Sequence, residues 1–377
     1  MRPLLPSLAI LACFAAPAQE PSADIPSLIK AGNDSYMRGD YEAARQSLAQ
    51  AWEAAQQTPP DDPLRYDILK RLTSVRAAAG EFADADNYLQ MALNWRETLL
   101  GLGDPKVADD LLVSVGLCRG MKNYFRAHLI LDRAMAIHRS AFGAESPAMA
   151  DDFSLGAQLY LDQKNVRSAI DSLTAALEIR TRLAGALDRT LVPDLDRLAG
   201  AYITQRAYDK AEETYRHALV IRETLLGTDD ADLIASIDGL AYACFGEKKY
   251  EAEPIYQRLI ALWTKSVGEN HPMIAIALDK VAVFYADQKK YDLAKEAQDR
   301  ANAIRTHFLA SGLSIAAAEQ IEEGNQGAAL ALFHRALAVM DPPNPVYQEL
   351  HAEIEEIVKN QEHPPKVTKK APPPKKN

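Results

Sequence analysis

Histidine is the side chain most often used for acid–base catalysis and metal binding near neutral pH. The chain has eight of them, His128, His138, His217, His271, His307, His334, His351 and His363. None stands in a spacing that a familiar chemistry requires, because the sequence holds no H-E-x-x-H, C-x-x-C, G-x-x-x-x-G-K or G-x-S-x-G motif. We therefore predict that the chain is not an enzyme and binds no metal or cofactor.

Two of the histidines occupy positions that recur along the chain. His271 stands where other segments carry the Asp or Ser that opens a helix, so we predict a role in a connection. His138 stands where Arg96, Arg180 and Arg222 stand in other segments, which we interpret as a solvated helix face.

Pairs of aspartates recur at the starts of expected helices, at Asp109-Asp110, Asp151-Asp152 and Asp229-Asp230. The N-terminal end of a helix carries a partial positive charge that stabilises nearby anions. We interpret these pairs as partners of the helix dipole and assign them no chemistry.

The charge distribution excludes one class of function. The whole chain carries −10, but Arg2 is the only charge in residues 1–18 and five lysines are the only charges in residues 363–377, so residues 19–362 carry −16. Binding to nucleic acid needs clustered Lys and Arg. The balance predicts no nucleic-acid partner and is compatible with basic protein partners.

The segment 195–227 shows the pattern that the rest of the chain repeats. Leu195, Leu198, Ala199 and Tyr202 form one helical stripe, and a second stripe follows and ends at Gly227. A small residue recurs at spacings of 41, 42, 42, 42, 41, 42 and 35, at Ala44, Ala85, Ala127, Ala169, Ala211, Ala252, Ala294 and Ala329. Repeats of this period indicate helix pairs that stack into a solenoid, with alanine where two helices cross closely.

The connections repeat as well. Gly101, Gly143, Gly185, Gly227 and Gly268 are expected to end second helices, and Asp104-Pro105, Ser146-Pro147 and His271-Pro272 to open first helices. We predict an all-α, right-handed superhelical solenoid of about eight helix pairs over 26–340. A capping helix follows at 343–361, and 362–377 form a disordered Lys/Pro-rich tail.

The first residues indicate export. An apolar run is followed by Ala16-Pro17-Ala18, the small-residue pattern of a cleavage site, so we predict a secretory signal peptide at 1–18 and a linker at 19–25. In one alternative, Cys13 is lipidated and tethers the chain to a membrane; in another, the N-terminus is left uncleaved. Cys118 and Cys244 are predicted to be small core residues without a disulfide.

The recurring marks are Leu-Ala-x-x-Tyr before a turn, Tyr-x-x-Ala after it and Gly-x-x-Asp/His-Pro in the connection. Examples are Tyr208-Asp209-Lys210-Ala211, Ala218-Leu219-Val220-Ile221-Arg222-Glu223 and Gly268-Glu269-Asn270-His271-Pro272. At these residues the sequence resembles the tetratricopeptide repeat, in the long form typical of kinesin-light-chain-like proteins, over about residues 25–340. The resemblance implies a scaffold that recognises proteins or peptides, but it does not specify the partner.

The resemblance also implies a set of site residues. In such proteins the first helices line a concave face, where polar side chains hold a peptide backbone. The matching positions here are Asp196, Asp238 and Asp279, with Ser154 before them, and Tyr242 one helical turn from Asp238 adds an aromatic contact. They predict an acidic groove for a basic or extended segment, or alternatively a solvated face of an acidic protein.

Two functions follow from these observations. The first is an exported adaptor that binds a protein or peptide in the groove. The second is a structural spacer or self-assembling subunit of an envelope complex, in which the groove residues would be silent.

Overall fold

The computed structural model describes residues 24–249, 251–340 and 344–362. The expected leader 1–18, with Cys13, and nearly all of the expected tail lie outside the described residues. The described residues are helical throughout, with short connections and no strand. None of their helices is both long and apolar enough to cross a membrane. The all-α prediction is therefore confirmed.

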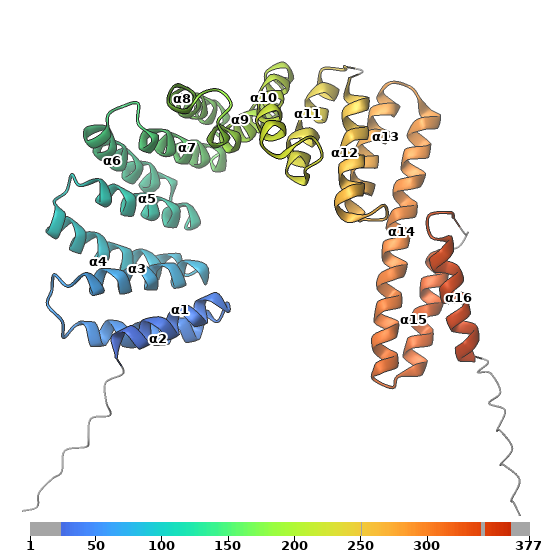
Figure 1. The fold of residues 1–377 in the computed structure, drawn as a ribbon, viewed down its shortest axis with the longest axis horizontal. Helices are drawn as coiled ribbons and strands as arrows, with labels where there is room; N and C mark the ends of the chain where they lie inside the picture. Colours follow the sequence, from blue (N-terminus) through green and yellow to red (C-terminus); the bar gives the residue numbers. More distant parts are fainter. Residues whose placement is uncertain (1–23, 250, 341–343, 363–377) are drawn as a thin grey trace, which may run out of the picture. The chain divides into compact units, whose positions relative to one another are not determined.

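The chain divides into two compact units, and the boundary in the sequence falls between Lys164 and Asn165. In the first unit, consecutive helices pack against each other in sequence order (Figure 1, blue to green). Its helices are α1 (Ile25–Met37), α2 (Tyr41–Ala55), α3 (Pro63–Ala78), α4 (Phe82–Leu100), α5 (Pro105–Gly120), α6 (Tyr124–Phe142) and α7 (Pro147–Asp162).

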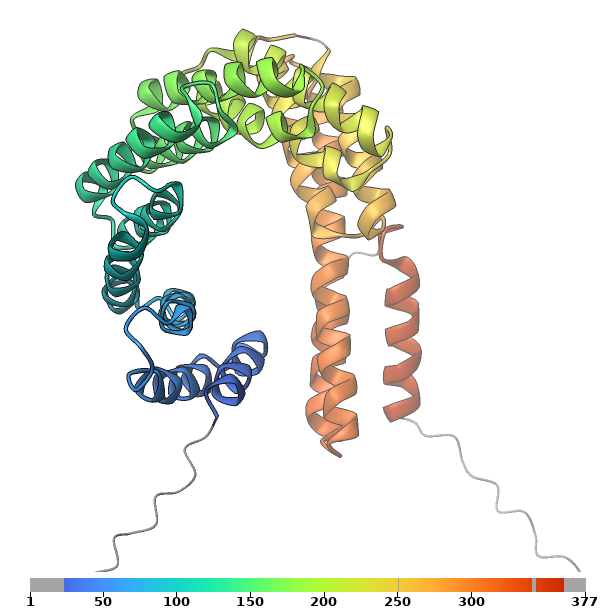
Figure 2. The same ribbon diagram turned by 60° about the vertical axis from the view of Figure 1, so that its left-hand side comes forward.

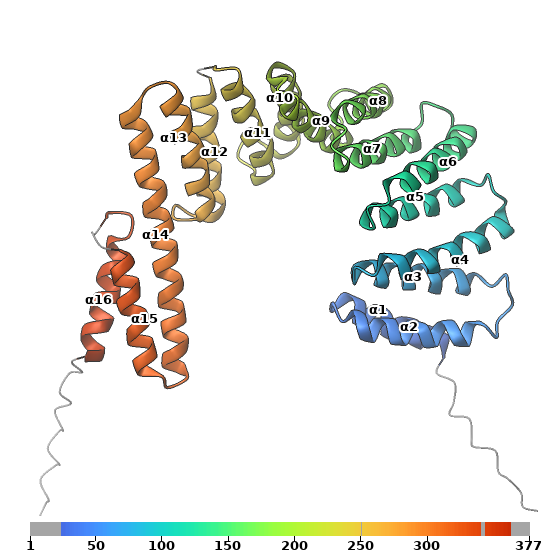
Figure 3. The ribbon, with the colours of Figure 1, turned by 180° about the vertical axis from the view of Figure 1, so that it is seen from behind.

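The second unit continues with the same alternation of helices (Figure 3). Its elements are α8 (Val166–Ala184), the 3₁₀ turn η1 (Arg189–Leu191), α9 (Val192–Thr204), α10 (Tyr208–Leu226), the 3₁₀ turn η2 (Ala231–Leu233), α11 (Ile234–Gly246), α12 (Ala252–Val267), α13 (Pro272–Asp287), α14 (Tyr291–Glu322), α15 (Gln326–Val339) and α16 (Gln348–Glu362).

Small residues lie where helices approach closely, as the repeat pattern predicts. Of the eight recurring alanines, all except the half-buried Ala294 are buried. A methyl group added at Gly239 in α11 would come within 2.3 Å of the Tyr215 ring of α10, and one at Gly246 within 2.5 Å of the Tyr208 ring. Glycine is required at these crossings because an aromatic ring fills the space that a Cβ atom would need.

The predicted helix ends are also confirmed. Gly101, Gly143, Gly185, Gly227 and Gly268 each follow a second helix with φ between 87° and 91°, a conformation that L side chains rarely adopt. His271 is the N-cap of α13, where its Nδ1 accepts a hydrogen bond from the Met273 backbone N–H at 3.3 Å. Its expected role in the connection is therefore confirmed.

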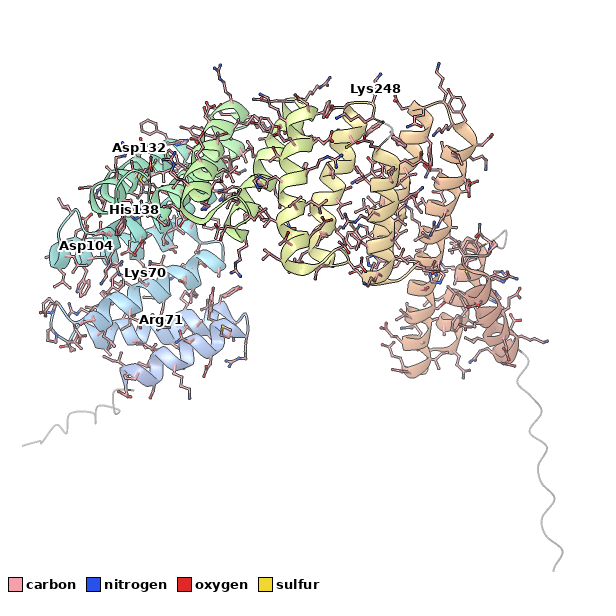
Figure 4. The ribbon with its side chains drawn as sticks, turned by 45° about the horizontal axis from the view of Figure 1, so that its top comes forward. Lys70, Arg71, Asp104, Asp132, His138 and Lys248 are labelled. Atoms are coloured by element: carbon pink, nitrogen blue, oxygen red, sulfur yellow. The ribbon has the colours of Figure 1, made fainter. Side chains whose placement is uncertain are left out.

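The turns inside the helix pairs hold a feature that the repeat pattern does not predict. Lys122, Lys164, Arg206, Lys248 and Lys289 have positive φ between 57° and 62° (Figure 4 labels Lys248). A left-handed backbone costs an L residue other than glycine about 1 kcal/mol or more. All five side chains are exposed, so the turns tolerate them without displacing any core residue.

The repeat pattern fails near the end of the second unit. The eighth helix pair was expected to begin after a connection, but α14 runs unbroken for 32 residues, from Tyr291 to Glu322. One repeat after Gly268 and Pro272 the chain has Ala310 and Ser314, so it lacks both the glycine that ends a helix and the proline that starts the next. The helix therefore continues, with Ala310 fully buried.

The end of the second unit is a group of three helices. α15 packs along the second half of α14, and α16 packs against both (Figures 1 and 2, orange to red). Phe333 of α15 and Ile354 of α16 are buried in their common core. The expected capping helix at 343–361 is present, but it starts at Gln348, after a turn in which Asn344 Oδ1 accepts from the Val346 N–H at 3.0 Å.

Candidate peptide-binding surface

Four of the five predicted site residues lie on first helices of the second unit. Asp196 is on α9, Asp238 and Tyr242 are on α11, and Asp279 is on α13. Their side chains are partly exposed, at 28% for Asp196 and 37% for both Asp238 and Asp279. The three carboxylates are therefore accessible from solvent.

Ser154 lies elsewhere. It is on α7 in the first unit, it is buried, and its hydroxyl donates to the Ala150 carbonyl at 2.9 Å. A hydroxyl that is buried and bonded to its own helix does not present itself to a partner. Ser154 therefore lacks the solvent-accessible side chain that the three aspartates have.

Each of the three aspartates has a basic partner within the second unit. Asp196 accepts from Arg222 Nη2 at 2.6 Å and Nη1 at 3.1 Å. Both oxygens of Asp238 accept from Lys280 Nζ, at 2.5 and 2.7 Å. Asp279 pairs with Arg305.

These pairs weaken the acidic groove expected from the sequence. A compensated carboxylate attracts a second cation less strongly than an isolated one. The field of the aspartates is still felt locally, because burial first, and then the charges of Asp196 and Asp238, raise the pKa of Tyr215. A peptide-binding role for these residues stays a prediction, but charge alone is a weaker basis for it than the sequence suggested.

A cavity of about 460 Å³ opens beside Asp238, between α11, α12 and α13. Its walls are mainly apolar, and Ile276 is 45% exposed at its edge. The Asp238–Lys280 pair lies on the same lining. The lining residues are Ala231, Asp232, Ile234, Ala235, Asp238, Leu259, Trp263, Ser266, Met273, Ile276, Ala277 and Lys280.

Tyr242 extends this surface by one helical turn from Asp238. Its side chain is 44% exposed, and its ring meets the edge of Tyr208 with the centroids 6.4 Å apart. Trp263, Met273 and Ile276 were not predicted as site residues, because hydrophobic periodicity does not distinguish them from core residues or from isolated apolar residues on the surface. The signal that could have identified them is the combination of a Trp, a Met and an Ile near one helix connection.

The recurring Arg and His positions are not a solvated face, and this interpretation was wrong. The side chains of Arg96, His138 and Arg180 are only 15%, 3% and 14% exposed. Each reaches across from a second helix to an aspartate fourteen residues later on the next first helix. We call these inter-repeat pairs; they are Arg96–Asp110, His138–Asp152 and Arg180–Asp194.

The interpretation of the aspartate pairs as helix-dipole partners needs the same correction. Asp110, Asp152 and Asp194 are at most 2% exposed, so the second member of each of the first two pairs is a buried partner of an inter-repeat pair. Asp230 does cap η2 through the Asp232 N–H at 2.8 Å, as expected for a residue at a helix start. Buried charges need partners because desolvation penalises them strongly.

The buried thiols follow the prediction. Cys118 and Cys244 are both free and fully buried. Burial raises the pKa of Cys118, and it raises that of Cys244 to about 11. Both cysteines are therefore small core residues whose thiols stay protonated at neutral pH.

The comparisons with known proteins agree with this architecture. Residues 195–232 match the tetratricopeptide repeat family model. BtubC (BKLC) from P. vanneervenii is 22% identical over 60% of this chain and 92% of its own, with a TM-score of 0.53. No curated protein matches the chain significantly.

Two further solved structures have the same fold at lower identity. The C-terminal part of a TPR repeat-containing protein from Cytophaga hutchinsonii is 14% identical, covering 73% of this chain and 95% of that one, with a TM-score of 0.53. The apo form of the quorum sensor NprR from B. thuringiensis is 13% identical, covering 91% and 89%, with a TM-score of 0.50. The solved structures therefore show a tetratricopeptide-type helical repeat fold, and the family model matches one stretch of it, residues 195–232.

Proposed function

We propose that the chain is a non-enzymatic scaffold that binds an extended peptide segment across α11 and α13. The observation that carries the proposal is the cavity beside Asp238, where a mainly apolar lining and a half-exposed ion pair meet at the surface. Binding sites for small groups have this composition, with apolar walls and a few placed polar atoms. The tetratricopeptide fold supports the class of function.

Magnitudes indicate what kind of segment fits. Burying one large apolar side chain contributes about 1.5–3 kcal/mol, whereas an exposed ion pair is worth about 0–1 kcal/mol. An apolar side chain held against Trp263, Met273 and Ile276 should therefore supply most of the affinity. Asp238 and Lys280 would then orient the peptide backbone or a flanking charged residue.

The test begins with a probe selected from a library of random twelve-residue peptides displayed on phage. The selected peptide is then titrated against the full chain by fluorescence anisotropy. Ile276→Asp places a charge in the cavity and should weaken binding at least tenfold. Val283→Asp is the matched control, because Val283 is on the same helix, is 57% exposed and does not line the cavity.

Two outcomes would contradict this function. Equal effects of the two substitutions would mean that the peptide binds elsewhere. Concentration-dependent self-association in light scattering, together with no selected peptide and a silent Ile276→Asp variant, would favour the spacer or self-assembling subunit instead.

Export of the chain is a separate part of the proposal. It is supported by the apolar run and Ala16-Pro17-Ala18, which lie outside the described residues. Intact mass spectrometry of the chain from its native host should give a mature protein that begins at Gln19. A lipid on Cys13 would instead place it at a membrane, and a mass that includes Met1 would contradict cleavage.

A further inference from the structure

The inter-repeat pairs differ in how completely they are hydrogen-bonded. Arg96 spans from α4 to α5, where Nη1 lies 3.1 Å from Asp110 Oδ2 and donates to the Lys106 carbonyl at 2.6 Å. Its guanidinium also lies over the Tyr66 ring, 4.0 Å from the centroid. The long arginine side chain therefore fills the space between the two helices.

His138 stands in the same position one repeat later and is shorter. Its Nδ1 lies 2.8 Å from Asp152 Oδ2. Because a carboxylate oxygen can only accept, Nδ1 carries the hydrogen, and the tautomer that places its single hydrogen on Nδ1 leaves Nε2 as an acceptor. Asp152 Oδ1 has no hydrogen-bond partner among the described residues, although Asp152 is fully buried.

His138 Nε2 has no hydrogen bond in the part of the chain that the structure describes. It points toward Asp109, whose Oδ1 lies 4.0 Å away, which is too long for a direct hydrogen bond. One donor group placed between the two atoms could reach both, because two hydrogen bonds of about 2.9 Å together span more than 4.0 Å. One ring nitrogen of a largely buried histidine and an exposed carboxylate thus lie 4.0 Å apart without a hydrogen bond between them.

A cavity of about 430 Å³ occupies this place, between α5, α6 and the start of α7. Figure 4 labels two of the residues on its wall, His138 and Asp104. The residues that line it are Asp104, Pro105, Lys106, Asp109, Leu112, His138, Phe142, Ala148 and Asp151. Ala148 is the counterpart of Lys106, whose carbonyl receives the Arg96 guanidinium one repeat earlier.

The lining has the character of a site for an organic cation. Asp104, Asp109 and Asp151 carry carboxylates, against a single ammonium on Lys106. Asp104 accepts from the Lys106 backbone N–H at 2.8 Å and Asp151 also has an interaction within the chain, so Asp109, 4.0 Å from His138 Nε2, is the carboxylate on which the site depends. Leu112 and Phe142 supply apolar walls, and the Phe142 ring lies 5.8 Å from the His138 ring. Cations bind favourably over aromatic rings, and a guanidinium does so with little loss of hydration.

We propose that this cavity binds a guanidinium group on a short apolar stem, such as an arginine side chain from another molecule. Arg96 and Arg180 hold a guanidinium at the matching position of the neighbouring repeats, whereas His138 leaves a ring nitrogen on the cavity that can receive one from outside. The N–H groups of the incoming guanidinium would donate to His138 Nε2 and to Asp109, and its stem would lie against Phe142 and Leu112. This site is in the first unit and does not rest on the peptide surface proposed for the second.

The experiment uses the full chain labelled with ¹⁵N-histidine, and it follows the imidazole signals by NMR. The signals of His138 are assigned by their absence in the His138→Arg variant. N-acetylarginine amide should shift them in a saturable manner, whereas N-acetylcitrulline amide, which is neutral and similar in shape, should not. Ethylguanidinium distinguishes an arginine side chain from a small guanidinium compound as the natural ligand. It lacks the peptide groups, so it binds as tightly as the arginine probe only if those groups make no contact with the chain.

Binding of the labelled arginine probe to variants of the chain is then measured by equilibrium dialysis, to show where on the chain the probe binds. His138→Arg supplies the missing side chain from within and should abolish binding while the helical circular dichroism is retained. His128→Arg, on the same helix and outside the cavity, should bind as the wild type does. Asp109→Asn alters an exposed side chain without disturbing the core and should weaken binding several-fold.

Three results would overturn the proposal. The first is an equal shift of His138 by the arginine and citrulline probes. The second is no shift of His138 by any guanidinium probe up to saturation of the solution. The third is wild-type binding by both His138→Arg and Asp109→Asn, which would place the probe elsewhere on the chain.

Discussion

Asp110 and Asp152 occupy the same place in successive repeats, and both are buried, but their surroundings differ. Asp110 accepts from the Tyr66 hydroxyl and from Lys70 Nζ, both at 2.8 Å, and pairs with Arg96. Asp152 accepts from His138 alone and leaves one oxygen without a partner among the described residues. Figure 4 labels Lys70, which donates to Asp110, and His138, which pairs with Asp152.

The comparison shows that equivalent buried aspartates in two repeats can have different hydrogen-bond partners while the helices around them keep the same arrangement. Replacing arginine by histidine at one position keeps the contact to the aspartate, but it shortens the reach of the side chain and reduces its N–H donors from five to at most two. The energetic result is a partly satisfied buried carboxylate and a cavity, both of which are costly in a purely structural protein. Four substitutions or conditions test whether the two aspartates behave as differently as their contacts indicate.

The largest expected effect is that of Asp110→Ala. Removing this carboxylate leaves Arg96, Lys70 and the Tyr66 hydroxyl without their common acceptor in a place that solvent barely reaches. Breaking a buried pair from one side costs about 3–5 kcal/mol. Urea unfolding should show a loss of at least about 3 kcal/mol. A loss below 1 kcal/mol would show that water replaces the carboxylate easily.

His138→Arg should raise the stability of the chain. The guanidinium would gain charge-assisted hydrogen bonds to Asp152, each worth about 1.5–3 kcal/mol, and would lose about 1.5–2 kcal/mol of rotamer freedom. The net gain should be about 1 kcal/mol, measured as a higher urea midpoint with an unchanged slope. The matched change Arg96→His should have the opposite sign, and the same sign for both would contradict the comparison.

Asp152→Asn should have a small effect at neutral pH. The asparagine oxygen can still accept from His138 Nδ1–H, and the oxygen that becomes an amide nitrogen has no partner to lose among the described residues. We expect the free energy of unfolding to be unchanged or higher by up to about 1 kcal/mol, because the buried charge is removed. Asp110→Asn should lose clearly more, and equal losses would contradict the difference between the two sites.

The smallest effect is the pH dependence of the same variant. Burial raises the pKa of Asp152, and the His138 hydrogen bond only partly opposes this. A carboxyl with a raised folded pKa stabilises the protein fully below its unfolded pKa of about 3.9, and this contribution is lost as the pH rises through the folded value. The wild type should therefore gain stability relative to Asp152→Asn on acidification from pH 7 toward about pH 4.5. An equal difference at both pH values would show that Asp152 is not desolvated.

The framework of the fold could be predicted from the sequence because it depends on small and special residues. Alanines at constant spacing, glycines at helix ends and His271 at a helix start each have one physical explanation, and the structure confirms them. The three aspartates were also placed correctly on first helices, although their binding role stays a prediction. The continuous helix α14 could also have been predicted, because Ala310 and Ser314 stand where other repeats have the glycine and proline of a connection. The repeat pattern instead predicted that the helix would end near these residues.

The inter-repeat pairs and the two cavities could not be predicted in this way. An arginine and an aspartate fourteen residues apart lie on different helices, so neither helix pattern shows that they meet. On its own helix each looks like a solvated polar position. Cavities depend on side-chain volumes from three helices at once, which is why Trp263 and His138 were not recognised as their walls.

The unbroken helix α14 has a consequence for how the second unit unfolds. In a repeat protein each pair contacts its neighbours only, so pairs can open separately from an end. Here the second helix of one pair and the first of the next are a single helix, so residues 306–314 share backbone hydrogen bonds with both sides. Native-state hydrogen exchange should therefore show α13 to α16 opening as one cooperative segment rather than α15 and α16 fraying first.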